Sequence, residues 1–446
     1  MSSTLRIPNE IWLQIFSHFE SHSSQLFVHK LDRSALTSLS LVSRDISRLA
    51  QHVLYRSIYH AGEVSSLLLL ATTIILTPRL GSAVRAFRVN AFLPRLTGAE
   101  QRYLEEMIKY TSIPPQLKST LQDTLNDNHY SDRGSGIAVV ASLLLAHMPG
   151  LRSFDGPGQY ASLFPALSWI LGGGFVEPRG GTETCSRTAP NYLPDLQEVL
   201  LPGNSLLPFG NAQNLLLHPN IKTLQMHGVT CTEGANKDLL SRNFKSSLQR
   251  LVISDCVIDI TFLQYIMFQC NDLSELSLGT GAGLPGQPQE SLNIDLYGGI
   301  LRDLGRNLIG SLRQLKRLRH LCVDRIWLVG HGQDRLPLTQ VLPASLETFR
   351  CMVPWCDEEL VESEWTPDQD AEILGLLDRV EFPNLYELRT PRWTTSGKQP
   401  FLKKIDGWHI RADSNAWYEL GGRADGDWIY STPWATRWDL TITRES

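Results

Sequence analysis

Few residues of this sequence have the types and spacing that a catalytic site needs. Gly279, Gly281 and Gly283 follow an apolar segment as a dinucleotide-binding turn does, but the third glycine is off the spacing of that motif. Leu284-Pro285 then stands where the helix of such a turn should begin. The motifs GxxxxGK[ST], HExxH and GxSxG do not occur. The sequence therefore predicts a protein that has no catalytic residues and is not an enzyme.

Metal and cofactor sites are not indicated either. The seven cysteines are scattered and odd in number, and no two have CxxC spacing. Histidines such as His218, His320 and His331 are isolated, so they form no recognisable ligand cluster. We expect no metal, no cofactor and no disulfide framework, with buried thiols in a reducing compartment.

Charge and hydropathy limit the partners. The chain has 446 residues, a net charge of −5 and no long basic run, which argues against nucleic acid or an anionic membrane as a partner. The N-terminus lacks a signal-peptide pattern. The most apolar run, Leu67–Leu76, is about half of the ~20 residues that a membrane span needs, so it predicts a buried helix. We expect an intracellular protein, cytoplasmic or nuclear.

The elements begin with a compact helical unit over residues 5–58. Pro8 suits the first turn of a helix, where its missing N–H costs nothing. A loop is predicted over residues 20–30, followed by a second helix that runs from Ala35 through Val42 to Leu49 and by a third apolar patch over Val53–Ile58. The apolar residues that recur at helical spacing in the first helix are Ile11, Ile15, Phe16 and Phe19.

A different period begins near residue 80. From there the pattern L-x-x-L-x-L recurs, with other apolar residues in place of some leucines. Each occurrence predicts a short strand with two apolar side chains on one face. Four occurrences, from Leu196 to Leu273, are 25, 27 and 25 residues apart, which is an interval typical of leucine-rich repeats. The full set begins at Val84, Leu151, Leu196, Ile221, Leu248, Leu273, Leu318, Leu346 and Leu385.

Helices are predicted between these strands. Thr97-x-x-Glu100 is a capping box, and Ile137–His147 and Leu301–Leu318 have helical periodicity. Strand plus helix in each unit predicts a curved solenoid with its strands along one side.

Other segments are predicted to lie outside the repeats. Gly172–Thr188 and Gly279–Ser291 are glycine-rich loops, and Asp357–Glu372 has eight acids and no Lys or Arg. This acidic segment is interpreted either as a solvated insertion or as a site for a basic target. Six of the eleven tryptophans lie between residues 393 and 438, which indicates a hydrophobic terminal cap or a ligand platform.

The segment LRIPNEIWLQIFSHF…LTSLSLVSRDISRLAQHVLYRSI resembles the F-box, especially that of the large repeat-containing families of filamentous fungi. The matching pieces are Ile7-Pro8, Glu10-Ile11, Ile15-Phe16, Leu39–Arg44 and Leu54-Tyr55. The resemblance implies a three-helix unit that docks on the Skp adaptor of a cullin-RING ubiquitin ligase. The loop at residues 20–30 is longer than usual for the family. The positions that match the docking surface are Ile7, Pro8, Ile11, Ile15, Leu39, Val42, Ser43 and Arg44.

The later repeats resemble the degenerate leucine-rich repeats of the same proteins, which implies a binding surface without catalytic residues. In each strand the residues that alternate with the apolar pair face the concave side. The candidate target-binding residues are Gln225, His227, Arg250, Glu275, His320, Asp324, Arg350 and Arg389.

The fold class predicted for the chain is α/β, with an F-box over residues 1–60, a leucine-rich-repeat-like solenoid over 61–392 and a Trp-rich C-terminal cap over 393–446. The predicted function is the substrate-recognition subunit of an SCF-type ubiquitin ligase, with the Skp adaptor, the cullin and an unknown protein target as partners. The alternatives are a cullin-independent repeat scaffold and an enzyme with an unrecognised site.

Overall fold

A computed structural model gives the fold of the chain. It describes residues 8–17, 20–21, 30–31, 33–60, 63–89, 96–126, 135–156, 166, 170, 192–201, 207–208, 215–216, 218–227, 229–231, 246–254, 257–258, 264, 267–279, 311–324, 328, 337–352, 371, 374–394, 405–417 and 435–445.

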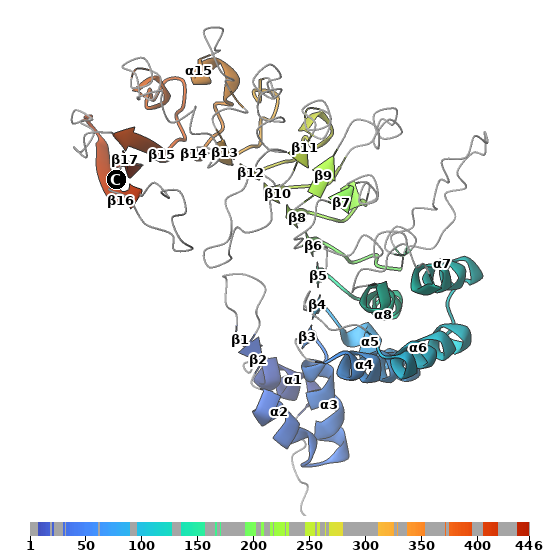
Figure 1. Ribbon diagram of the computed structural model, residues 1–446. Helices are drawn as coiled ribbons and strands as arrows, with labels where there is room; N and C mark the ends of the chain where they lie inside the picture. Colours follow the sequence, from blue (N-terminus) through green and yellow to red (C-terminus); the bar gives the residue numbers. More distant parts are fainter. Residues whose placement is uncertain are drawn as a thin grey trace, which may run out of the picture. The chain divides into compact units, whose positions relative to one another are not determined.

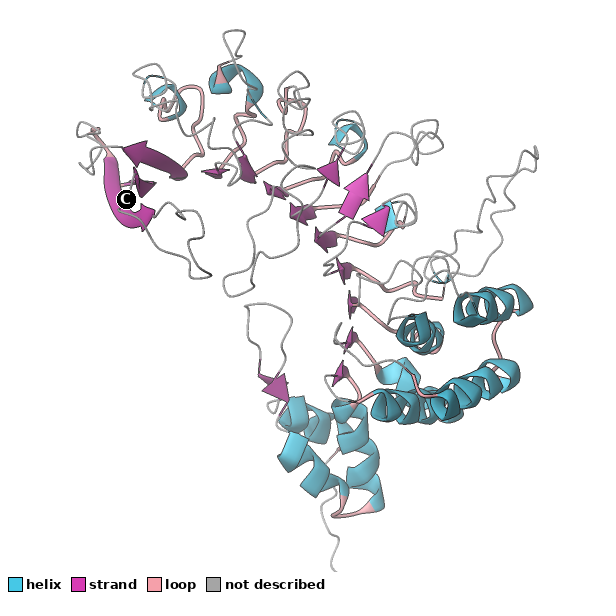
Figure 2. Cartoon of the chain, in the orientation of Figure 1, coloured by secondary structure: helices cyan, strands magenta, loops and turns pink. Residues whose placement is uncertain are grey.

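The chain divides into two compact units, Met1–Gln225 and Met226–Ser446, and each is described by itself. Both units contain helices or helical turns together with strands (Figure 2). The predicted mixture of helices and strands is therefore confirmed. The predicted boundaries at residues 60 and 392 stay predictions.

The first unit begins with three helices, α1 (Asn9–Ser17), α2 (Arg33–Ser40) and α3 (Arg44–Leu54). Their shared core contains Phe16, Leu36, Ala50 and Val53, all buried, with the Trp12 ring 5.6 Å from that of Phe16. Between α1 and α2, where a loop was predicted, β1 (Glu20–Ser21) pairs antiparallel with β2 (Lys30–Leu31).

The predicted second helix through Val42 is wrong in its length. The helix α2 ends at Ser40, and α3 begins after Ser43, whose hydroxyl accepts a hydrogen bond from the Ile46 N–H at 3.2 Å. A serine is a favoured helix N-cap, so it starts a new helix here although the apolar period continues through it.

The strands of the first unit pair in parallel and in chain order, and helices cover one side of them (Figure 1). The apolar residues of the predicted strands, such as Phe87 and Phe154, are buried, and these two rings stack at 6.2 Å. The strands are β3 (Ser57–His60), β4 (Ala86–Val89), β5 (Ser153–Asp155) and β6 (Glu198–Leu201), and a short β7 (Leu207–Pro208) follows. The helices are α4 (Val64–Leu76), α5 (Pro78–Ala83), α6 (Gly98–Tyr110), α7 (Pro115–Asn126) and α8 (Ser135–Ala146).

Three helical predictions are confirmed in this unit. The apolar run at Leu67–Leu76 lies in α4, which buries Leu67, Leu68, Ala71 and Ile74. The capping box opens α6, because the Thr97 hydroxyl accepts from Glu100 N–H and the Glu100 carboxylate accepts from Thr97 N–H. The helix predicted over residues 137–147 is α8.

The second unit continues with strands that are parallel from β10 to β15, and β8 (Thr223–His227) crosses the boundary between the units. At the C-terminus β17 lies antiparallel between β15 and β16, and Trp408, Leu440 and Ile442 are buried there. The strands are β9 (Val229–Cys231), β10 (Arg250–Ser254), β11 (Val257–Ile258), β12 (Glu275–Gly279), β13 (His320–Asp324), β14 (Thr348–Met352), β15 (Glu387–Thr394), β16 (Trp408–Trp417) and β17 (Ala435–Arg444), with a helix α15 (Leu338–Val341).

The helix predicted over Leu301–Leu318 is wrong in its described part, because residues 311–318 form turns. The N–H groups of Leu315 and Leu318 bond to the carbonyls three residues earlier, at Leu312 and Leu315. All three leucines are buried. Apolar residues three positions apart over so short a segment look like part of a helical period. Here the backbone forms successive tight turns instead.

One backbone pattern recurs throughout both units. The carbonyl of the residue just before one strand accepts two hydrogen bonds, at 2.7–3.3 Å, from the residue just before the neighbouring strand and from the first residue of that strand. The acceptors are Arg56, Arg85, Arg152 and Gln197 in the first unit, and Gln249, Ser274, Arg319 and Glu347 in the second. Successive strands are therefore joined by the same backbone geometry, although the segments between them differ in length.

Several predicted segments lie outside the described residues. Gly172–Thr188 does so entirely, while only Gly279 of Gly279–Ser291 and only Ala371 of Asp357–Glu372 are described. Trp428 and Trp434 also lie outside them. Within the described part of the chain, no helix combines the length and the apolar character that crossing a membrane requires.

Candidate functional site

The first candidate surface consists of apolar side chains that the N-terminal helices leave exposed. In α1, Trp12 and Phe16 point into the three-helix core, while Ile11 and Ile15, four residues apart, are 44% and 40% exposed. The turn between α2 and α3 exposes Leu41 by 83% and Val42 by 65%. We call these four residues the exposed aliphatic set.

The other predicted docking residues have different surroundings. Pro8 is exposed, and its carbonyl accepts the first hydrogen bonds of α1, from Ile11 and Trp12. Leu39 is half-buried against the three-helix core, and Ser43 caps α3. Arg44 is exposed at the first position of α3, and Ile7 lies outside the described residues. Leu41, the most exposed of the aliphatic residues here, was not among the docking positions inferred from the sequence.

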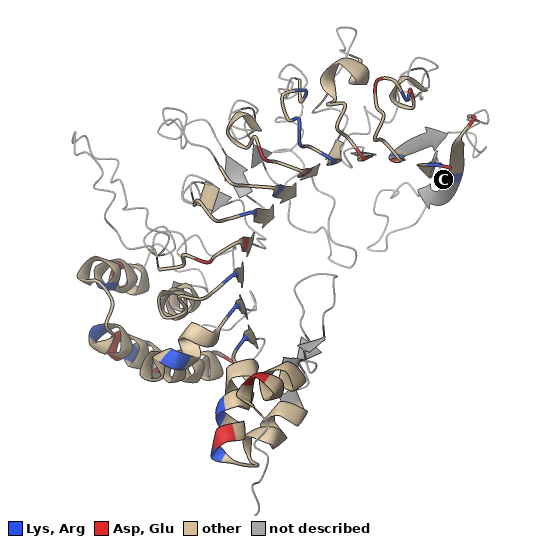
Figure 3. Ribbon diagram, turned by 180° about the vertical axis from the view of Figure 1, so that it is seen from behind, with Lys and Arg blue, Asp and Glu red and all other residues tan. Residues whose placement is uncertain are grey.

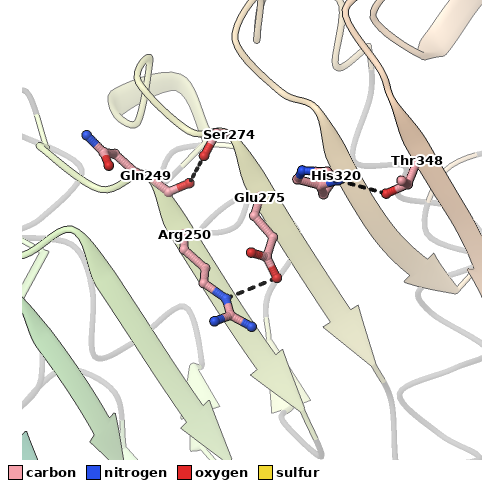
Figure 4. Close-up of polar contacts among 6 residues, drawn as sticks. All are labelled: Gln249, Arg250, Ser274, Glu275, His320 and Thr348. Atoms are coloured by element: carbon pink, nitrogen blue, oxygen red, sulfur yellow. Dashed lines mark hydrogen bonds and ion pairs between the residues drawn. The ribbon is translucent and has the colours of Figure 1, made fainter. Parts of the chain in front are cut away.

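The second candidate surface is the polar face of the strands in the second unit, where three of the predicted residues, Arg250, Glu275 and His320, form side-chain contacts across neighbouring strands (Figure 4). Arg250 Nε lies 3.0 Å from Glu275 Oε1, across the register of β10 and β12. His320 Nδ1 lies 2.9 Å from Thr348 Oγ1, across β13 and β14. Such cross-strand pairs stabilise the sheet by only about 0.2–1 kcal/mol each. Their side chains can therefore exchange these contacts for contacts with a partner.

Further along this face, Arg350 and Arg389 are register partners on β14 and β15, and both are exposed. Arg389 also forms an ion pair with Glu387 on its own strand. Gln225, the last residue of the first unit, is 9% exposed, so its amide offers little surface to a partner. His227 and Asp324 occupy strand positions in β8 and β13, but their side chains are not among those that the structure describes.

Sequence reasoning missed a third group, which lies on the polar face of the first unit. Arg88 of β4 has its Nε 2.8 Å from Asp155 Oδ2 of β5, and its guanidinium carbon lies 5.2 Å from the ring centre of Tyr59 in β3. The Asp155 carboxylate is buried, and Oδ2 makes no well-directed hydrogen bond among the described residues. Burial raises the pKa of Asp155 to about 6, although the Arg88 charge opposes the shift.

His60 lies on the opposite side of β3, because it is in register with the buried Val89. Its Nε2 is 2.7 Å from Ser66 Oγ at the start of α4. Desolvation lowers the pKa of His60. His60 and Asp155 therefore do not share a site.

The remaining described residues that bear on chemistry include the Cys270 thiol and the possible metal ligands. Burial raises the pKa of the Cys270 thiol to about 12, and a thiol held protonated in this way is unreactive. Among the described ranges, no group of three His, Cys, Asp or Glu residues could hold a metal ion.

Residues 4–61 of the chain match the family model described as F-box-like. The matched segment contains α1, α2, α3 and β3, and therefore the exposed aliphatic set. No curated protein matches the chain. The N-terminal F-box-like region is thus confirmed, while the leucine-rich-repeat resemblance stays a prediction.

Proposed function

We propose that the chain is the substrate-recognition subunit of an SCF-type cullin-RING ubiquitin ligase, in which the F-box-like region docks on the Skp adaptor. The observation that carries the proposal is the exposed aliphatic set within the segment that matches the F-box-like family. Fully burying an exposed Leu, Ile or Val side chain contributes roughly 1.5–3 kcal/mol, and these four side chains, which are 40–83% exposed, would contribute in proportion. These four residues therefore favour a stable apolar contact.

The rest of the chain acts, in this proposal, as a leucine-rich-repeat-like solenoid that holds the protein target. The recurring backbone acceptor, the parallel pairing and the buried apolar rows of successive strands support the repeat interpretation. The antiparallel strands β15, β17 and β16 would close the end of the last repeat, with Trp408 in their apolar layer.

Such a receptor accelerates ubiquitin transfer by proximity. Holding the adaptor with one part and the target with another raises the local concentration of target lysines at the ligase, without chemistry by the receptor itself. The polar strand face supplies varied, partly exposed charges, which suit recognition of a specific protein.

The test is co-purification of the full chain with the Skp adaptor and the cullin. We expect Ile11→Asp and Val42→Asp each to abolish recovery of both partners, because a buried unpaired carboxylate is costly at an apolar contact. Both sites are solvent-exposed in the free chain, so circular dichroism should stay unchanged.

Leu69→Asp is the matched control, since Leu69 is 65% exposed on α4, outside the matched segment. Full recovery of the adaptor with folded Ile11→Asp and Val42→Asp variants would overturn the proposed docking. Recovery of the adaptor without the cullin would instead favour the cullin-independent scaffold.

A further inference from the structure

The outer side of α4 exposes leucine to solvent. Leu69 and Leu76 are 65% and 77% exposed, and at seven residues apart they lie on the same side of the helix. The buried Ala71 and Ile74 lie on the opposite side. No residue of α4 is charged, whereas α6 carries charges of both signs (Figure 3). A helix that is apolar all round is normally covered on all sides, so the outer side of α4 is typical of a surface that a partner covers.

The neighbouring helix α6 extends this surface with aromatic side chains. Tyr103 and Tyr110, also seven residues apart, are 43% and 74% exposed. The Thr72 hydroxyl of α4 lies 2.7 Å from the Tyr103 hydroxyl and donates to the Met107 sulfur at 3.3 Å. Thr72 lies between Leu69 and Leu76 on α4, so the contact with α6 runs beside both leucines. We call the four exposed residues the helical patch: Leu69, Leu76, Tyr103 and Tyr110.

The size of the helical patch suits a protein partner. An aromatic side chain has roughly 150–250 Å² to bury, so at these exposures the two tyrosines present roughly 180–290 Å² between them. With the two leucines, the patch reaches the size at which an exposed apolar surface commonly marks an interaction site. A stable interface buries about 800 Å² on each partner, as an apolar core with a polar rim. The patch therefore has the size of such a core.

The charges beside the patch indicate which partner fits it. Arg102 and Glu106 are exposed and lie one turn apart on α6. When two copies of α6 pack antiparallel about a two-fold axis between these positions, Arg102 of each copy lies opposite Glu106 of the other. The present contacts of both residues leave this possible. Arg102 Nε donates to the Gly98 carbonyl at 3.2 Å, and a guanidinium has further donors. Glu106 lies 4.0 Å from Lys109 in a pair that is mostly exposed and contributes little.

The same antiparallel arrangement accommodates the most exposed aromatic ring. It places Tyr110, at the end of one α6, against the start of the other α6, where Gly98 and Ala99 are exposed. A Cβ added at Gly98 would meet nothing within 4 Å, so there is open space at this position for a ring. Shape and charge are therefore both self-complementary on this side of α6.

We propose that the helical patch binds the same patch of a second copy, which makes the chain a two-fold symmetric homodimer. A two-fold interface uses one surface on both subunits, so that surface must complement itself, as Arg102 with Glu106 and Tyr110 with Gly98 do here. The proposal goes beyond the function proposed above and does not depend on it. A dimer would present two copies of each strand face, so a target with two binding segments would be held more tightly than by one chain.

The test is sedimentation equilibrium of the full chain, without the adaptor, from low to high micromolar concentration. We expect a dimer whose dissociation constant rises at least about a hundredfold in Leu76→Asp and in Tyr110→Asp, because each places unpaired carboxylates in the apolar core of the interface. Circular dichroism should stay unchanged, since both residues are exposed in the single chain. Val380→Asp is the matched control and should remain dimeric, because Val380 is 88% exposed in the second unit.

A charge exchange tests the arrangement itself. Arg102→Glu and Glu106→Arg should each weaken the dimer, and the double variant Arg102→Glu/Glu106→Arg should restore it, while Arg152→Glu should have no effect. A wild-type chain that stays monomeric at high micromolar concentration would overturn the proposal, as would a double variant no tighter than either single one.

Co-purification of the adaptor separates the dimer from the proposed function. A monomeric chain that recovers the adaptor would refute only the dimer, and a dimeric chain that recovers no adaptor would refute only the docking.

Discussion

The substitution Asp155→Asn should change how the stability of the protein depends on pH. Asp155 is 3% exposed, and its Oδ2 lies 2.8 Å from Arg88 Nε without a well-directed hydrogen bond. Desolvation of the carboxylate outweighs the attraction to Arg88, so the pKa rises from 3.8 to about 6. Asn keeps the shape of the side chain and removes the charge.

The size of the effect follows from the two pKa values. One pH unit corresponds to 1.36 kcal/mol, so the difference between 3.8 and about 6 corresponds to about 3 kcal/mol. This is an upper bound, because local relaxation and water penetration reduce the desolvation penalty of a buried charge.

The direction is set by which state binds the proton more tightly. The folded chain holds the Asp155 proton more tightly than the unfolded chain does, so this group favours folding most at low pH. Its contribution to the free energy of unfolding falls as pH rises from about 4 to about 6, and is constant above that. Relative to Asp155→Asn, the wild type should therefore lose up to about 3 kcal/mol over this window.

Two buried histidines also change stability with pH, so the wild type must be compared with the Asp155→Asn variant. Burial lowers the pKa of His60 and of His218, so each destabilises the folded state as pH falls below 6.5. Their slope is opposite to that of Asp155 in the same pH window. Because both proteins contain both histidines, the difference between the two curves isolates Asp155.

The assay is thermal unfolding of both proteins, followed by circular dichroism, between about pH 4 and pH 7. With an unfolding entropy of about 2.1 cal/mol/K per residue over 446 residues, the wild-type melting temperature should fall relative to the variant by up to about three degrees as pH rises. Asp123→Asn, at an exposed position of α7, is the control and should give parallel curves. A constant difference between wild type and Asp155→Asn would refute the reasoning.

Three further perturbations test the fold. Leu251→Ala in β10 should lower the free energy of unfolding by about 2–5 kcal/mol, because Leu251 is fully buried. Urea denaturation measures this loss, and a loss below about 1 kcal/mol would contradict the core position of Leu251. Thr97→Ala should cost about 1 kcal/mol by removing the capping box of α6, and Thr97→Ser should restore most of it. Removal of residues 400–446 deletes β16 and β17 and uncovers β15, so the product should aggregate; a soluble, cooperatively folding truncation would refute the proposed cap and favour a tryptophan ligand platform.

The strands with apolar rows could be predicted from the sequence because their signal is local. At β4, for example, Val84 just before the strand and Phe87 and Val89 within it are all buried as the pattern requires. Strand β3 was missed, because Ile58 and His60 do not carry the leucine pattern on which the other strands were recognised. The antiparallel pairing of β15, β17 and β16 was missed as well, since it joins segments far apart in the sequence.

The candidate surfaces were less predictable for the same reason. The exposure of Ile11 and Ile15 follows from helical spacing, but that of Leu41 depends on where α2 ends. The contact of Arg88 with Tyr59 and Asp155 joins three strands whose pairing is a tertiary property. A pattern read along one segment at a time cannot bring such residues together.

The recurring backbone acceptor explains how one fold can offer different surfaces. At the start of each strand the structural bond is made by the carbonyl, which every residue type has. The side chain at that position is therefore free to vary, and it is Arg, Arg, Arg and Gln in the first unit but Gln, Ser, Arg and Glu in the second. Because buried leucine rows and backbone bonds hold the strands, a change at an exposed position such as Arg152→Glu should alter the free energy of unfolding by no more than about 0.5 kcal/mol.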